Sequence, residues 1–143
     1  MPTPGHTSKL LILSAVVMLA CDRREEDVQP TNMPLARETA LQFGTALANR
    51  DYAGAYAMTT VEFRATMSLD TMQATFEEMV PLDWVMGPID AVDVLEEWPD
   101  MQAGDLGMIY VSIGGEVYSE GVTVIVNNTE GEPRVRQAEF GRP

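Results

Sequence analysis

The chain has 143 residues, of which 22 are acidic and only 9 are lysine or arginine, so its formal net charge is −13 at pH 7. Phosphate backbones and anionic lipid surfaces repel so acidic a protein, which argues against nucleic-acid binding. His6 and Cys21 are its only histidine and cysteine. The part of the chain after Cys21 therefore cannot contain a histidine-based triad, a thiol nucleophile or a zinc site of His and Cys, and a single cysteine cannot form an internal disulfide. We expect no cofactor and no metal.

Residues 1–20 have the pattern of an export signal. Lys9 precedes an uncharged apolar run that extends from Leu10 to Ala20, as in the hydrophobic region of a signal peptide. As a helix this run would span about 16 Å, well short of the ~30 Å hydrocarbon core of a bilayer. We therefore expect cleavage of this segment, with an uncleaved anchor as the alternative.

The end of this run carries a possible lipidation site. The segment Met18-Leu19-Ala20-Cys21 resembles a bacterial lipobox, in which the cysteine is diacylated and becomes the new N-terminus. Met18 departs from the leucine that is usual at that position. The resemblance implies lipidation at Cys21 and attachment to the bacterial cell envelope, on its periplasmic or extracytoplasmic face. The alternative is an ordinary cleaved signal followed by an unmodified cysteine.

The segment after Cys21 is too polar to fold by itself. Residues 22–32 are charged or polar almost throughout, and such a segment cannot bury enough apolar surface to offset its ordering entropy. We interpret residues 21–32 as the acylated cysteine and a disordered tether, and residues 33–143 as a single domain.

Helical signals fill the first half of that domain. Asn32 is a good N-cap for a first helix that ends before residues 49–51. A short helix is expected over 52–58. The spacing from Thr59 to Glu62 fits a capping box. Ser68 then caps a further helix, which Pro81 ends.

From Pro88 onward the hydrophobic period changes from 3.6 to 2. Gly114 and Gly115 suit a hairpin turn, and Gly121 suggests a bend or a bulge within a strand. The predicted strands cover residues 89–98, 107–113, 116–126 and 134–140. Helices followed by strands predict an α+β fold, with the N-terminal helices packed on a curved antiparallel sheet of about four strands.

The helical half resembles a known family. The segment from Leu35 to Tyr56, in which a long helix ends at Asp51-Tyr52, is similar to the opening of a nuclear-transport-factor-2-like domain. Residues 63–68 and the helix after them continue the pattern. The resemblance covers residues 33 to 140 and implies a cystatin-like α+β cone.

That family contains isomerases and dehydratases as well as many non-catalytic binding domains. Its enzymes use an Asp–His pair, which this chain lacks, or a tyrosine with carboxyl groups in an apolar cavity. No catalytic role carries over residue by residue. The candidate ligand-binding residues are Tyr56, Asp83, Trp84, Tyr110 and Tyr118. Asp83 and Trp84 could equally cap a loop and cover the edge of the core.

Arg134, Arg136 and Arg142 are the only basic concentration in the second half of the chain. They could receive an acidic partner, or they could pair with neighbouring carboxylates.

Three functions remain open at this point. The preferred one is a membrane-tethered lipoprotein of the cell envelope with a non-catalytic domain that binds a protein or a small apolar ligand. The second is a cone-cavity enzyme of the isomerase or dehydratase type that uses tyrosine and carboxyl groups. The third is an immunity or inhibitor lipoprotein that neutralises a secreted toxin.

Overall fold

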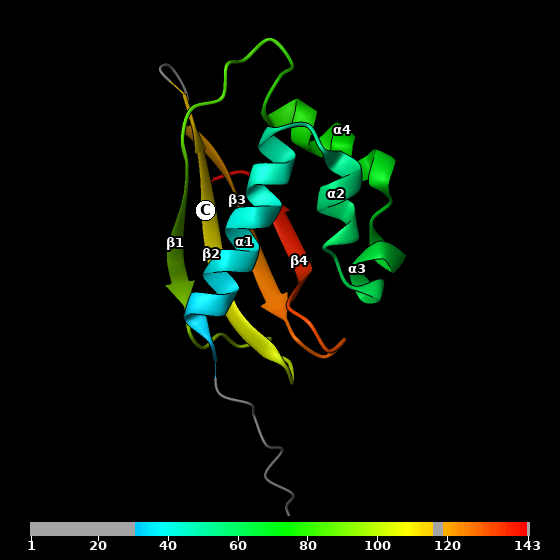
Figure 1. Cartoon of the computed structure of the whole chain (residues 1–143), viewed down its shortest axis with the longest axis vertical. Coiled ribbons are helices and arrows are strands. Elements are labelled where there is room, and N and C mark those ends of the chain that lie inside the picture. The colour runs from blue at the N-terminus through cyan, green and yellow to red at the C-terminus, as the bar shows by residue number, and fades with distance from the viewer. Residues whose placement is uncertain (1–30, 116–118, 143) are drawn as a thin grey trace, which may run out of the picture.

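The computed structural model describes residues 31–115 and 119–142, which form four helices followed by four strands (Figure 1). The predicted signal peptide 1–20, the lipidation site Cys21, most of the predicted tether, and Tyr118 lie outside the described residues. Within them, the order of the elements confirms the predicted α+β fold class.

The helices begin at polar side chains that cap them. They are α1 (Met33–Ala48), α2 (Tyr52–Ala57), α3 (Val61–Thr66) and α4 (Leu69–Met79). The Asn32 side chain accepts a hydrogen bond from the Leu35 N–H at 3.2 Å. Ser68 accepts one from the Thr71 N–H at 3.1 Å. Both predicted N-caps are thus confirmed, and each stabilises its helix by about 1 kcal/mol.

The cap of α3 lies one residue later than the sequence predicts. The hydroxyl of Thr60, not of Thr59, accepts a hydrogen bond from the Phe63 N–H at 3.1 Å. Thr59 is held in a bridge to Val135. Because that bridge keeps Thr59 extended, the chain turns into the helix only at Thr60.

The strands form a single antiparallel sheet. They are β1 (Ile89–Leu95), β2 (Asp105–Gly114), β3 (Ser119–Asn127) and β4 (Arg134–Phe140), in the spatial order β1-β2-β3-β4. This confirms the predicted meander, and β4 covers the predicted range. β1 ends at Leu95 instead of Trp98, and β2 begins at Asp105, two residues before the predicted start.

The bulge predicted at Gly121 is absent, because Gly121 lies opposite Ser112 in regular register. The register of β3 with β4 shifts instead between Ile125 and Val126. A Cβ atom at Gly121 would overlap the ring of Tyr110. This glycine therefore permits the close approach of an aromatic ring.

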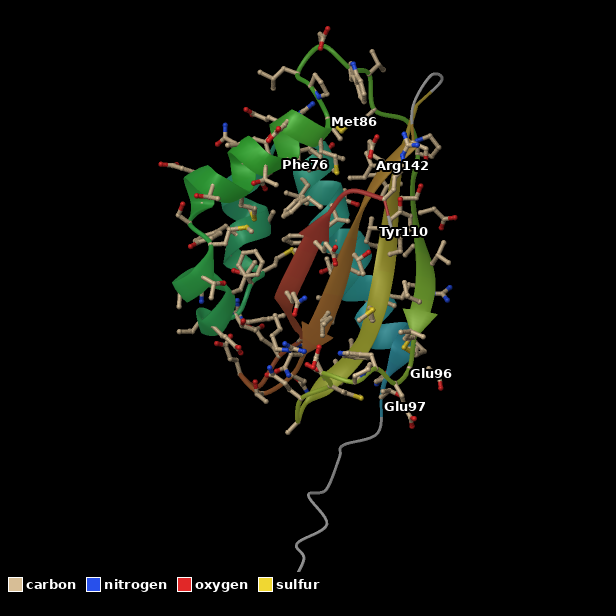
Figure 2. All side chains as sticks on the ribbon, turned by 180° about the vertical axis from the view of Figure 1, so that it is seen from behind. Phe76, Met86, Glu96, Glu97, Tyr110 and Arg142 are labelled. Atoms are coloured by element: carbon tan, nitrogen blue, oxygen red, sulfur yellow. The ribbon has the colours of Figure 1, made fainter. Side chains whose placement is uncertain are left out.

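All the described helices lie on one face of the sheet (Figure 1). Figure 2 views the opposite face, on which none of them packs. α1 lies along the sheet and contacts β1 and β2 above all. Ile109, Val111 and Ile113 alternate along β2 toward the helices and are fully buried. Burial of each such side chain stabilises the fold by about 1.5–3 kcal/mol.

Candidate binding surface

The structure does not bring the predicted ligand-binding residues together. Tyr56 lies in the helical layer, where its hydroxyl donates to the Met67 carbonyl at 3.0 Å and its ring packs edge-on against Phe63. Asp83 and Trp84 lie in the connection between α4 and β1, where Asp83 is exposed and Trp84 packs against the core.

Tyr110 belongs to the other side of the sheet. It alternates with the helix-facing Ile109 and Val111, so its ring lies on the uncovered face (Figure 2). The ring packs across Gly121 toward Glu120 and Arg142. Burial raises the pKa of Tyr110 above its ordinary value of 10.0, Glu120 adds to that rise, and Arg142 opposes it. The hydroxyl therefore stays protonated at neutral pH, where it can donate a hydrogen bond.

Each of the three predicted partner-binding arginines is paired with a carboxylate. Arg134 bonds to Glu132 and lies 3.5 Å from a Glu130 oxygen. Arg142 donates to Glu120 at 3.0 Å and to the Ser119 carbonyl at 2.9 Å. This is the intramolecular pairing that the sequence left open.

Arg136 is the most buried of the three. It donates to both oxygens of Asp105, at 2.8 and 2.7 Å, and the Asp105 side chain is completely buried. Asn127 donates to the same carboxylate at 2.8 Å, and so does the Gln102 N–H. This cluster joins β2, β3 and β4 to the loop that precedes β2, so Arg136 has a structural partner.

Three rows of opposed residues cross the uncovered face of the sheet, since directly opposed residues in an antiparallel sheet share a face. The rows are Leu95–Met108–Ile125, Val92–Tyr110–Thr123 and Asp90–Ser112–Gly121. Exposure of the apolar side chains increases toward β1: Ile125 is 4% exposed, Leu95 45% and Val92 52%. The first two rows thus form an apolar surface that opens at the β1 edge.

The two edges of the sheet differ. Residues 58–60 run alongside β4, where the Thr60 N–H donates to the Val135 carbonyl and the Val135 N–H donates to the Met58 carbonyl, both at 2.9 Å. Within residues 31–115 and 119–142, no segment pairs with the outer edge of β1. The free edge and the exposed apolar surface therefore coincide.

Acidic residues also stand at both ends of β1. No lysine or arginine lies between Arg64 and Arg134, a stretch that contains α4 and the first three strands. Asp90 lies near the start of β1, and Glu96 and Glu97 follow its end and point away from the sheet (Figure 2). We call β1 together with Asp90, Glu96 and Glu97 the β1 edge.

This surface is not among the sites predicted from the sequence, although the pattern of β1 contains a signal for it. β1 is apolar at Ile89 and Ala91 on the helix-facing side and also at Val92 and Leu95 on the other side. A strand with one solvated face alternates apolar and polar residues. β1 departs from that alternation, since Val92 and Leu95 present apolar side chains on the face that the described helices do not cover.

The described part of the domain has further surface features. A shallow depression of about 420 Å³ lies over the outer side of α1, and another of about 240 Å³ lies between α3 and β4. No group of three His, Cys, Asp or Glu side chains within the described ranges could hold a metal ion. None of the helices placed by the structure is both long and apolar enough to cross a membrane.

No family model, curated protein or solved structure matches this chain.

Proposed function

We propose that this chain is a bacterial lipoprotein, held at the cell envelope through Cys21, whose folded domain binds a partner and does not catalyse a reaction. The observation that carries the proposal is the lipobox-like Met18–Cys21 segment at the end of a short apolar run. The domain begins at a helix capped by Asn32, 11 residues after Cys21. Such an arrangement suits a domain that works close to a membrane surface.

The interior of the domain supports binding over turnover. An enzyme of the cone-cavity type needs an open pocket that contains an ionisable group. Here Phe43, Met72 and Phe76 are fully buried within the core shared by the helices and the sheet. Of the candidate acid–base groups, Tyr56 uses its hydroxyl to hold Met67, and Asp83 is exposed.

Membership of the nuclear-transport-factor-2-like family is part of the same proposal. Its support is the order of the elements and the position of all described helices on one sheet face. An immunity or inhibitor lipoprotein is a second candidate, favoured by the absence of cations between Arg64 and Arg134. A surface of that kind attracts a basic partner by electrostatic steering.

Lipid attachment can be tested directly on the full chain expressed in a bacterium that is fed an alkyne-tagged fatty acid. We expect the wild type to incorporate the tag and to sediment with membranes, and Cys21→Ser to do neither. As a control, Ser14→Cys in the Cys21→Ser background returns a cysteine at the wrong position and should stay untagged. An untagged, unprocessed wild type in the cytosol would contradict the proposal.

A further inference from the structure

We propose that the β1 edge receives an extended segment of a partner protein, rich in lysine or arginine alternating with apolar residues, as an additional strand of the sheet. This inference rests on the proposed binding function and assigns to it a surface and a chemical class of partner. Strand addition supplies main-chain hydrogen bonds for affinity and alternate side-chain contacts for specificity.

The hydrogen bonding of the outer edge of β1 supports strand addition. Residues of an antiparallel strand turn their N–H and C=O groups alternately to one neighbour and to the other. The Ala91 N–H donates to the Asp90 carboxylate at 2.9 Å, so this donor points to the outer edge and not to β2. An incoming strand can take over that donor. The Asp90 carboxylate is then released to pair with a cation of the partner.

The apolar surface beside that edge also favours an added strand. β1 has three exposed apolar side chains within four positions: Val92 is 52% exposed, Val94 41% and Leu95 45%. Long exposed apolar edge strands are aggregation hazards unless a partner covers them or charges protect them. Alternate side chains of an added strand would cover the row that begins at Val92 and the row that begins at Leu95.

Charge decides between a second copy of this chain and a different partner. Pairing of β1 with β1 of another copy would bring acidic edges together, with Asp90 of each copy near acids of the other. Like charges on adjacent strands are destabilising. A basic segment instead meets Asp90, Glu96 and Glu97, and β1, β2 and β3 themselves contain no lysine or arginine. The edge therefore fits a basic partner.

The experiment uses the full chain, purified in detergent, and a fluorescent peptide as long as β1 with alternating valine and lysine. Binding is followed by fluorescence anisotropy. We expect the same peptide with glutamate for lysine to bind at least about tenfold more weakly, and added salt to weaken the lysine peptide because exposed charges are screened. Equal affinities of the two peptides would overturn the proposal.

A matched pair of variants locates the site. Val92→Lys and Val61→Lys each replace an exposed valine, 52% and 66% exposed, and add the same charge, but Val61 lies in α3. We expect Val92→Lys to weaken binding about tenfold and Val61→Lys to leave it nearly unchanged. Equal losses would place the contact elsewhere and overturn the assignment to β1.

N-methylated peptides separate strand addition from any other docking. In one set of lysine peptides, methyl groups on alternate amides block the N–H groups that would pair with β1. In the other set, they block the N–H groups on the opposite edge of the peptide. We expect the first set to lose binding and the second to retain it. Equal behaviour of the two sets, or a dimer of this chain that Val92→Lys dissociates in sedimentation, would overturn the proposal. Fatty-acid labelling at Cys21 is independent of all these results, so failure here is distinguishable from failure of the lipoprotein assignment.

Discussion

The packing of Tyr110 on Gly121 shows what a single residue contributes to the uncovered face. Without a side chain at Gly121, the phenol ring lies directly on the backbone of β3. That position brings the ring close to Glu120 and Arg142, which act on the pKa of its hydroxyl in opposite directions. One glycine thus permits the packing of the aromatic side chain that lies beside Val92.

This contact predicts a specific cost for a methyl group. Gly121→Ala places a Cβ atom in the ring of Tyr110 and should lower the free energy of unfolding by about 1–3 kcal/mol. Gly114→Ala is the control, since the nearest atom to its added Cβ is 4.0 Å away. Urea denaturation measures both. In the Tyr110→Ala background the cost of Gly121→Ala should shrink, and an unchanged cost would contradict the steric explanation.

At the scale of elements, Arg50 ties the turn after α1 to the end of α4. Its backbone adopts a φ of 61°, which is unfavourable for residues other than glycine. Its guanidinium donates to the carbonyls of Val80 and Pro81 at 2.9 and 3.0 Å and lies 5.4 Å from the centre of the Phe76 ring. A cation at the C-terminal end of a helix also interacts favourably with its dipole.

Two substitutions at Arg50 separate the side chain from the backbone. Arg50→Ala removes the bonds to the end of α4 and should lower the free energy of unfolding by about 1–3 kcal/mol. Arg50→Gly removes the same bonds, but glycine adopts the positive φ freely, so this variant should be about 1 kcal/mol more stable than Arg50→Ala. Thermal unfolding monitored by circular dichroism compares them. If Arg50→Gly is the less stable of the two, the strain at this turn is negligible.

At the scale of the whole molecule, the start of α1 and the connection between α4 and β1 lie at opposite ends (Figure 1). In the proposed lipoprotein the anchor therefore joins the end where α1 begins. β1 runs from the far end back toward that end, so its acidic C-terminal end lies on the side of the anchor. A partner strand on β1 would lie along the long axis of the domain.

The Asp105 cluster holds this architecture together across three strands. Arg136→Met leaves the fully buried Asp105 carboxylate without its cation, and we expect a loss of about 3–5 kcal/mol in the free energy of unfolding. Arg142→Met removes an exposed pair with Glu120 and should cost no more than about 1 kcal/mol. Urea denaturation distinguishes the two variants. Similar midpoints for both would mean that burial does not set the strength of the Asp105 pair.

Local signals predicted the elements well and their long-range partners poorly. The caps at Asn32 and Ser68 and the range of β4 depend on neighbours in the sequence, and they are confirmed. The cap at Thr60 and the role of Gly121 depend on Val135 and Tyr110, which are distant in the sequence. A pattern of neighbouring residues contains no information about such contacts.

The sequence by itself determined the α+β class, the helical first half and the strands of the second, because hydrophobic period and turn residues act over a few positions. Only the tertiary structure decided which side chains meet. It paired residues 58–60 with β4 at Val135, and among the residues that it describes it placed no segment against the outer edge of β1. It also paired Arg136 with Asp105, and it put Tyr56 and Tyr110 on opposite sides of the sheet. These outcomes depend on strand order and register, which emerge only when the sheet and the helices pack around one core.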